Sequence, residues 1–256
     1  MLRASLLLSV LLGWVVPGLL GASEPLSREQ LRDGIDADGR VIDPELRQRT
    51  GWQVVRGLSW RIEREDPWQP GKFVPVEAHE TFHSGQRFRF EIEAFSNTFV
   101  YVVVANADGS QDVLLPEPDE QTPRLAKGEK RLLPSDGTAF RFQPPGGTHT
   151  LRLIASPGKL PWRESATLLK LQNGQQLPGP GEPAPGTARS VARVPSIPQV
   201  KGLKAAVRKI DEGSLAKGVT VELVEPTAEG NLVTLTSADP TSKPILVHDV
   251  ALKQAD

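Results

Sequence analysis

Within the stretch QRFRFEIEAF, the residues from Arg87 to Ala94 alternate strictly between charged and apolar side chains. The apolar ones among them are Phe88, Phe90, Ile92 and Ala94, and an arginine or a glutamate precedes each of them. In an extended chain this period of two places all the apolar groups on one face and all the charged groups on the other. The stretch therefore predicts a half-buried β-strand.

The same kind of pattern fills residues 52–172. Asp108-Gly109 is typical of a hairpin turn, and the return strand after it is expected to end at Pro116. Gly and Pro contribute 23 residues each, which favours many turns. The region predicts an all-β fold, an antiparallel β-sandwich of the immunoglobulin-like kind. Its strand-like segments are WQVVRGLSWRIERE, QRFRFEIEAF, TFVYVVVANADGSQDVLLP, KRLLP, TAFRFQ, THTLRLIAS and ATLLKLQ.

Residues 1–22 have the layout of a secretory signal peptide. Arg3 precedes an apolar run from Leu6 to Val16, and Ala22 or Ser23 provides a small residue near a cleavage point. The run is shorter than the about 20 residues that a membrane span needs. We therefore expect a periplasmic or secreted mature chain without a membrane span. Because the sequence contains no cysteine, its core must close without disulfides.

The polar segment 23–51 contains two signals. Ser27 and Gln30 are spaced like a capping box, which predicts a short helix over Ser27 to Asp33. Downstream, GIDADGRVIDPE, residues 34–45, places Asp36, Asp38 and Glu45 at positions three, five and twelve of a calcium-binding EF-hand loop.

The EF-hand match has two defects. Gly34 offers no side-chain oxygen at the first position, and Pro44 occupies a position where the second helix should already be running. A polar Asp-Gly turn is the favoured interpretation. A calcium-dependent interaction module remains the alternative.

The C-terminal third divides into two parts. Residues 173–198 are rich in Pro and Gly and predict a linker. Residues 199–256 predict a short helix, from the spacing of Leu203, Val207 and Ile210, and three strands. The strands are expected to join the main domain or to form a small subdomain beside it, at Val219 to Val224, Asn231 to Thr236 and Pro244 to Leu252.

The pentapeptide His79-Glu80-Thr81-Phe82-His83 matches the zinc-protease pattern H-E-x-x-H. That pattern works on a helix, where two histidines four residues apart share one face. Here a proline stands four residues before His79, and Ser84-Gly85 follows His83 directly, so the flanks favour an extended chain. In an extended chain the two imidazoles would lie about 13 Å apart. We therefore expect no zinc site, and a zinc metallopeptidase is kept as an alternative.

The other groups that could carry chemistry have plainer interpretations. His149 and His248 lie in strand-like segments and are expected on solvent-facing sides, as are Glu91 and Glu93. The formal net charge is −1 with both signs interspersed, which disfavours nucleic acid as a partner. No cofactor motif is present, so we expect none to be bound.

The tryptophans allow two interpretations. Trp60, Trp68 and Trp162 are candidate partner contacts, because an exposed indole stacks on a sugar ring or fills a pocket in a protein. Trp68 stands between two prolines in EDPWQPGK, a loop-like context. The alternative is that these side chains cap the ends of the sandwich core.

The middle of the chain resembles the bacterial domain of unknown function numbered 4384. The resemblance covers roughly Phe82 to Ser156 and consists of turn and core residues. The matching residues are Phe82, Gly85, Phe99, Tyr101, Gly109, Leu114-Leu115-Pro116, Gly128, Pro134, Pro145-Gly146 and Ala155-Ser156. It implies an all-β module of exported or envelope-associated bacterial proteins, with no established catalytic residues to carry over.

Together these observations predict an exported bacterial envelope protein that works as a non-catalytic binding module. The expected partner is another envelope protein or a cell-wall glycan.

Overall fold

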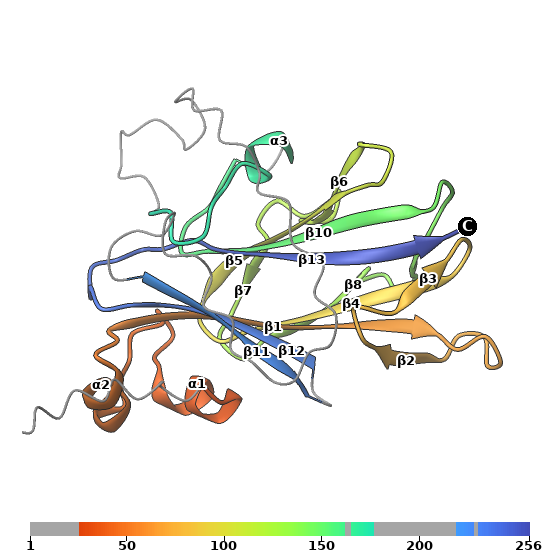
Figure 1. Ribbon diagram of the computed structural model, residues 1–256. Helices are drawn as coiled ribbons and strands as arrows, with labels where there is room; N and C mark the ends of the chain where they lie inside the picture. Colours follow the sequence, from red (N-terminus) through yellow and green to blue (C-terminus); the bar gives the residue numbers. More distant parts are fainter. Residues whose placement is uncertain (1–25, 162–164, 177–218, 228–229) are drawn as a thin grey trace, which may run out of the picture.

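In the computed structural model, which describes residues 26–161, 165–176, 219–227 and 230–256, two β-sheets pack face to face (Figure 1). The predicted all-β sandwich is confirmed. The predicted signal peptide, the predicted helix within residues 201–213, Trp162 and the linker from residue 177 onward lie outside the described residues. No helix in the described ranges is long and apolar enough to cross a membrane.

The first sheet has seven strands among the described residues, and all its pairings are antiparallel. Its main order is β11-β12-β1-β4-β8; in addition β2 pairs with β1 and β9 with β4. The bounds are β1 (Val54–Glu65), β2 (Phe73–Val76), β4 (Arg87–Ala94), β8 (Lys130–Leu133), β9 (Phe140–Arg141), β11 (Val219–Thr227) and β12 (Gly230–Ser237).

The second sheet has six described strands in the main order β3-β13-β10-β5-β6, with β7 paired to β5. Its pairings are antiparallel except that β3 runs parallel to β13. The bounds are β3 (Thr81–His83), β5 (Thr98–Ala105), β6 (Gln111–Leu115), β7 (Arg124–Leu125), β10 (Gly147–Ser156) and β13 (Leu246–Ala255).

The core lies between the sheets and follows the predicted alternation. Phe88, Phe90, Ile92 and Ala94 of β4 are buried in one cluster together with alternate residues of β1, β5, β10 and β13. Burying one such large side chain stabilises the fold by about 1.5–3 kcal/mol. The hairpin predicted at Asp108-Gly109 is also present, joining β5 to β6.

The C-terminal strands complete both sheets. β12 pairs with β1 from Val54 to Trp60, whereas β13 pairs with β10 along nearly its whole length. β13 also contributes Leu246, Val250 and Leu252 to the core between the sheets. The sequence left open whether these strands join the main domain or form a small subdomain beside it. Their pairings show that they belong to the main sandwich.

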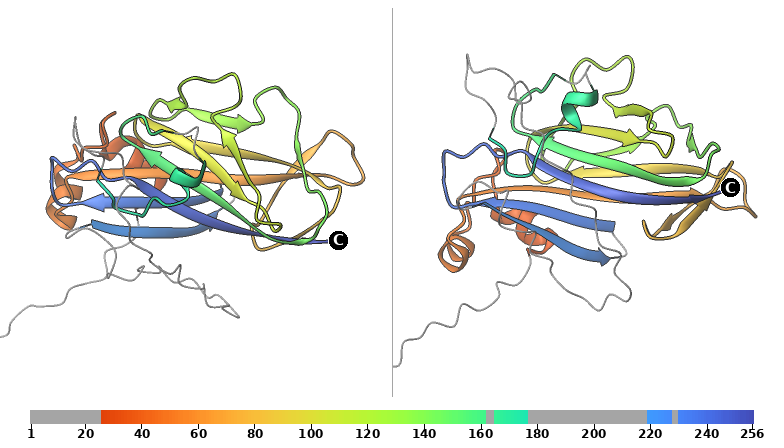
Figure 2. Two further views of the ribbon diagram at one scale, coloured as in Figure 1. Left: turned by 90° about the horizontal axis from the view of Figure 1, so that it is seen from above. Right: turned by 45° about the horizontal axis from the view of Figure 1, so that its top comes forward.

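Two short helices, α1 (Arg28–Gly34) and α2 (Pro44–Thr50), lie on the outer side of the first sheet (Figures 1 and 2). The predicted capping box of α1 is present, because Ser27 accepts a hydrogen bond from the backbone of Gln30 and Gln30 accepts one in return. Leu31 and Leu46 pack with Phe95 in a second hydrophobic cluster on this face. The polar segment thus forms a layer over the sheet.

This layer corrects the expectation that Glu93 faces solvent. Glu93 is 3% exposed, and its carboxylate lies 3.0 Å from the guanidinium of Arg32 and 3.7 Å from the ammonium of Lys130. Glu91, in contrast, is half-buried and pairs with Arg61 at 3.1 Å. Period-two patterning assigned these residues to the right face but could not show that α1 covers one end of it.

The outer face of the second sheet is covered by residues 157–161 and 165–176. ATLLKLQ, predicted as a strand, instead contains a short helical turn, α3 (Ser165–Leu168). Leu168 and Leu171 pack on Tyr101, which is fully buried and accepts a 2.7 Å hydrogen bond from the backbone of Leu160. Burial raises the pKa of Tyr101. The apolar residues of this segment pack in a cluster on the outer face of the sheet. Their spacing therefore does not require a strand.

His248 does not lie on a solvent-facing side as expected. It belongs to the inward face of β13, half-buried, with its ring 5.8 Å from that of Trp60 between centroids. Burial lowers its pKa from 6.5 to about 4, although the neighbouring Asp249 carboxylate opposes this shift. The folded protein therefore favours neutral His248.

This pKa predicts a specific loss of stability in acid. The contribution of neutral His248 is complete above about pH 6.5 and is lost as the pH falls toward 4, because the unfolded chain takes up the proton first. Between about pH 7 and pH 5 the loss should be about 1–2 kcal/mol. Urea denaturation across this range should show a steeper decline for wild type than for His248→Leu. Equal pH slopes for the two proteins would contradict the assignment.

Candidate functional site

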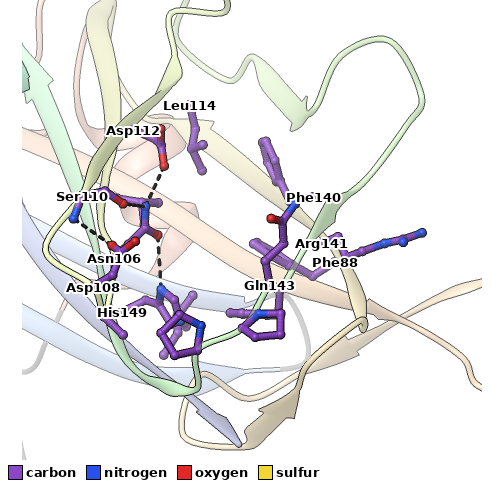
Figure 3. Close-up of a pocket in the computed structure, with 16 residues that line it drawn as sticks. Phe88, Asn106, Asp108, Ser110, Asp112, Leu114, Phe140, Arg141, Gln143 and His149 are labelled. Atoms are coloured by element: carbon purple, nitrogen blue, oxygen red, sulfur yellow. Dashed lines mark hydrogen bonds between the residues drawn. The ribbon is translucent and has the colours of Figure 1, made fainter. Parts of the chain in front are cut away.

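A cavity of about 380 Å³ opens at one end of the sandwich, between the β5–β6 hairpin and the segment from Phe140 to Pro145 (Figure 3). One wall is polar and is formed by Asn106, Asp108, Ser110 and Asp112 of the hairpin. The other lining residues are Phe88, Val104, Ala107, Leu114, Phe140, Arg141, Phe142, Gln143, Pro144, Pro145, His149 and Leu252. The cavity therefore combines an aromatic and aliphatic surface with a polar rim.

His149 joins the two walls through a chain of hydrogen-bonding groups and, contrary to expectation, is buried. Its Nδ1 lies 3.2 Å from Oδ1 of Asn106, and its Nε2 lies 2.7 Å from Oε1 of Gln254. Phe142 packs edge-on against the imidazole at 5.7 Å between centroids. His149 faces the cavity because it lies on the side of β10 that packs toward the core.

Both amides beside His149 have their orientation fixed from the far side. The amide nitrogen of Asn106 donates to Asp112 at 2.6 Å, and that of Gln254 donates to the carbonyl of Gln143 at 3.0 Å. Both amides therefore present oxygens to the imidazole. Each ring nitrogen of His149 therefore lies beside an amide oxygen of the fold.

Charge at the cavity is predominantly negative. The side chain and backbone of Ser110 donate to Asp108, which lowers the pKa of Asp108. Asp112 is exposed apart from its contact with Asn106. The guanidinium of Arg141 points away from the cavity (Figure 3).

The HETFH segment is not helical. His79 lies in a turn with an 80% exposed side chain, 3.0 Å from the Glu77 carboxylate. Thr81–His83 forms β3, so the extended geometry predicted around His83 is confirmed. Phe82 points into the core, where its ring lies 4.7 Å from that of Phe142. In the part of the chain that the structure describes, no three His, Cys, Asp or Glu side chains gather as they would around a metal.

The EF-hand-like segment folds as a tight turn. Oδ1 of Asp36 accepts hydrogen bonds from the backbone of Asp38 and Arg40. A Cβ on Gly39, whose φ is +82°, would lie 2.5 Å from the carbonyl oxygen of Val55. Glycine is therefore required at this close approach.

The charges of this turn are balanced within the protein. Asp38 and Asp36 favour the charged form of the buried Arg56, whose pKa burial itself lowers. Pro44, counted as a defect of the motif, begins α2 after the N-cap Asp43. A proline is favoured at the first helical position, so Pro44 marks the start of a helix.

The structure separates the three tryptophans proposed as partner contacts. Trp60 is 4% exposed and stacks on Phe90 in the core, which makes it unavailable at the surface. Trp68 is 89% exposed at the tip of the β1–β2 hairpin. Trp162 lies outside the described residues.

Comparison with known proteins adds one match. Residues 81–159 match the family model described as Domain of unknown function (DUF4384), which confirms the resemblance seen in the sequence. No curated protein and no solved structure matches the chain. All residues that line the cavity, apart from Leu252, fall inside the matched segment.

The hydrogen-bonded chain through His149 predicts a coupled effect on stability. Gln254→Leu should lower the free energy of unfolding by about 1–3 kcal/mol, because it leaves the Gln143 carbonyl and the imidazole without their partner. In a double-mutant cycle with His149→Phe, the two losses should be less than additive. Gln143→Ala is the matched control, since only its backbone carbonyl takes part. Additive losses would contradict the coupling.

Proposed function

We propose that this chain is an exported bacterial envelope protein that acts as a non-catalytic binding module, with Trp68 as its principal anchor. The observation that carries the proposal is the exposure of this indole, 89% of its surface, on an ordered hairpin. A large aromatic side chain that stays in water forgoes the about 1.5–3 kcal/mol of stabilisation that its burial would contribute. Tryptophan is enriched among the residues that contribute most of the binding energy at protein interfaces.

The hairpin that carries Trp68 is held in one shape. The backbone of Trp68 donates to Asp66 at 2.8 Å, and that of Gly71 donates to Glu65 at 2.7 Å. The turn closes with a 2.8 Å hydrogen bond from the backbone of Asp66 to the carbonyl of Lys72. A preformed contact loses little conformational entropy on binding.

The base of the hairpin is equally well fixed. Phe73 begins β2 opposite Glu65, and the guanidinium of Arg89 lies 4.0 Å from its ring centroid. Arg87 reaches the same ring at 5.9 Å and binds Glu65 at 2.8 Å. These contacts support a rigid platform from which the indole projects.

A binding role agrees with the chemistry of the described residues. Both ring nitrogens of His149 are engaged with amide oxygens, so this histidine is poorly placed to act as a general base. His248 faces the core beside Trp60. The export step rests on the signal-peptide pattern of residues 1–22.

A protein partner fits the shape of the hairpin better than a glycan does. Trp68 projects between Pro67 and Pro70 as a convex tip, which suits insertion into a pocket of a partner. A glycan would stack flat on the indole, and it is the alternative occupant that the test must separate.

Substitution at Trp68 tests the proposal. Immobilised wild-type chain should retain a defined protein from envelope extract, and Trp68→Ala should weaken binding of that purified partner by about tenfold or more. Trp68→Phe should restore part of the affinity. Both variants should keep the wild-type free energy of unfolding within about 0.5 kcal/mol, because the side chain is exposed.

Ile42→Ala is the matched control. Ile42 is 54% exposed and stands two residues before α2, and α2 lies at the opposite end of the molecule from the β1–β2 hairpin (Figure 1). It should bind the partner like wild type. Retention of isolated cell-wall glycan that depends on Trp68 would instead favour the glycan, and equal binding by wild type and Trp68→Ala would refute the anchor.

A further inference from the structure

The cavity at the end of the sandwich is large enough to take one long side chain. Its volume of about 380 Å³ is near the lower limit for ligand pockets, which run from about 300 to 1,000 Å³. Leu114, Phe140 and Phe142 give it an apolar surface long enough for an aliphatic stem. An apolar group that enters it leaves water, and this favours binding.

The polar wall determines which side chain fits. Asp108 and Asp112 stand on the same hairpin at the rim, and both keep exposed surface for a ligand. Arg141, the guanidinium at the rim, points away from the cavity (Figure 3). His149 lies behind Asn106, whose side chain separates it from the rim. The rim is therefore complementary to a cation.

We infer that this cavity binds a basic side chain, lysine or arginine, of a polypeptide partner. The aliphatic stem lies along Leu114 and Phe140, and the cationic head lies beside Asp108 and Asp112. The aromatic surface adds attraction for the same head, since the face of an aromatic ring attracts a cation. An anion would meet two carboxylates, and a purely apolar group would leave the polar rim without new partners.

The site and the Trp68 hairpin lie at the same end of the sandwich. Phe88, which lines the cavity, pairs with Arg64 of β1 immediately before the Trp68 hairpin begins. One polypeptide can therefore contact both. The inference nevertheless rests on the cavity alone and does not require Trp68 to bind anything.

Nuclear magnetic resonance with small probes tests the inference. The ¹⁵N-labelled chain from residue 23 onward, which keeps every described residue, is titrated with Nα-acetyl-lysine methylamide and with its neutral analogue, Nα-acetyl-norleucine methylamide. The lysine probe should bind about fivefold tighter, the size expected for two partly exposed charge pairs. Its shifts should be confined to amides of residues 104–114 and 140–149. The advantage should shrink as salt rises to about 0.5 M.

Charge-neutral variants supply the comparison. The double variant Asp108→Asn with Asp112→Asn should bind both probes equally, whereas Asp239→Asn should behave like wild type. Asp239 is a matched control because it closes an exposed turn by accepting from Thr241 two residues on, as Asp108 does from Ser110. Unchanged shifts outside the hairpin would show that the double variant is folded.

Three results would overturn the inference. They are equal affinity of wild type for the two probes, undiminished binding of the lysine probe by the double variant, and lysine-probe shifts located elsewhere. Glucosamine that binds in the cavity where the lysine probe does not would assign it to an amino sugar instead. Loss of binding at Trp68 leaves all of these measurements unaffected, so the two proposals fail separately.

Discussion

The structure depends on β1 being hydrogen-bonded along both edges. This strand has twelve residues, and it pairs with β4 on one side and with β12 and then β2 on the other. Its inward side chains Leu58, Trp60 and Ile62 meet the second sheet in the common core. Because β1 continues into the Trp68 hairpin and β4 carries Phe88 of the cavity wall, both candidate binding surfaces are positioned by this central pairing. The free-energy cost of exposing the Trp68 indole is thus offset by the stability of the sheets that carry its hairpin.

Sequence patterning succeeded where one local rule determined the outcome. Period-two alternation identified the buried face of β4, and Ser27 with Gln30 marked the start of α1. Its predictions were wrong where a further layer of structure covers the outer face of a sheet. Glu93 has the same alternation as Glu91, yet α1 covers only Glu93, and nothing in the pattern of β4 records that contact. The prediction for His248 was wrong for a similar reason, because the exposure of His248 depends on which side of β13 packs against β1.

The cavity was beyond sequence reasoning because its walls come from distant segments. Asn106 and Phe140 stand on different sheets, and Leu252 arrives from the end of the chain. What the sequence offered was the run NADGSQD, with an oxygen-bearing side chain at every second position. That run signals a hairpin turn on its own. It becomes one wall of a site only when the opposite loop lies across from it, which depends on the sandwich packing.

The turn at residues 36–40 shows why an oxygen-rich motif cannot by itself assign a cation. One carboxylate oxygen of Asp36 accepts hydrogen bonds from two backbone amides. Asp38 and Asp36 both stabilise the charge of Arg56 beneath them. Burying Arg56 without a counter-charge would be costly, so the two carboxylates have a structural reason to be present. A calcium ion at the same turn would add a second positive charge near that guanidinium, which donates its hydrogen bonds to Ser96 and Asn97. The positive charge that this segment requires is therefore supplied by β1 itself, and the resemblance to an EF-hand follows from a shared need for closely spaced carboxylates.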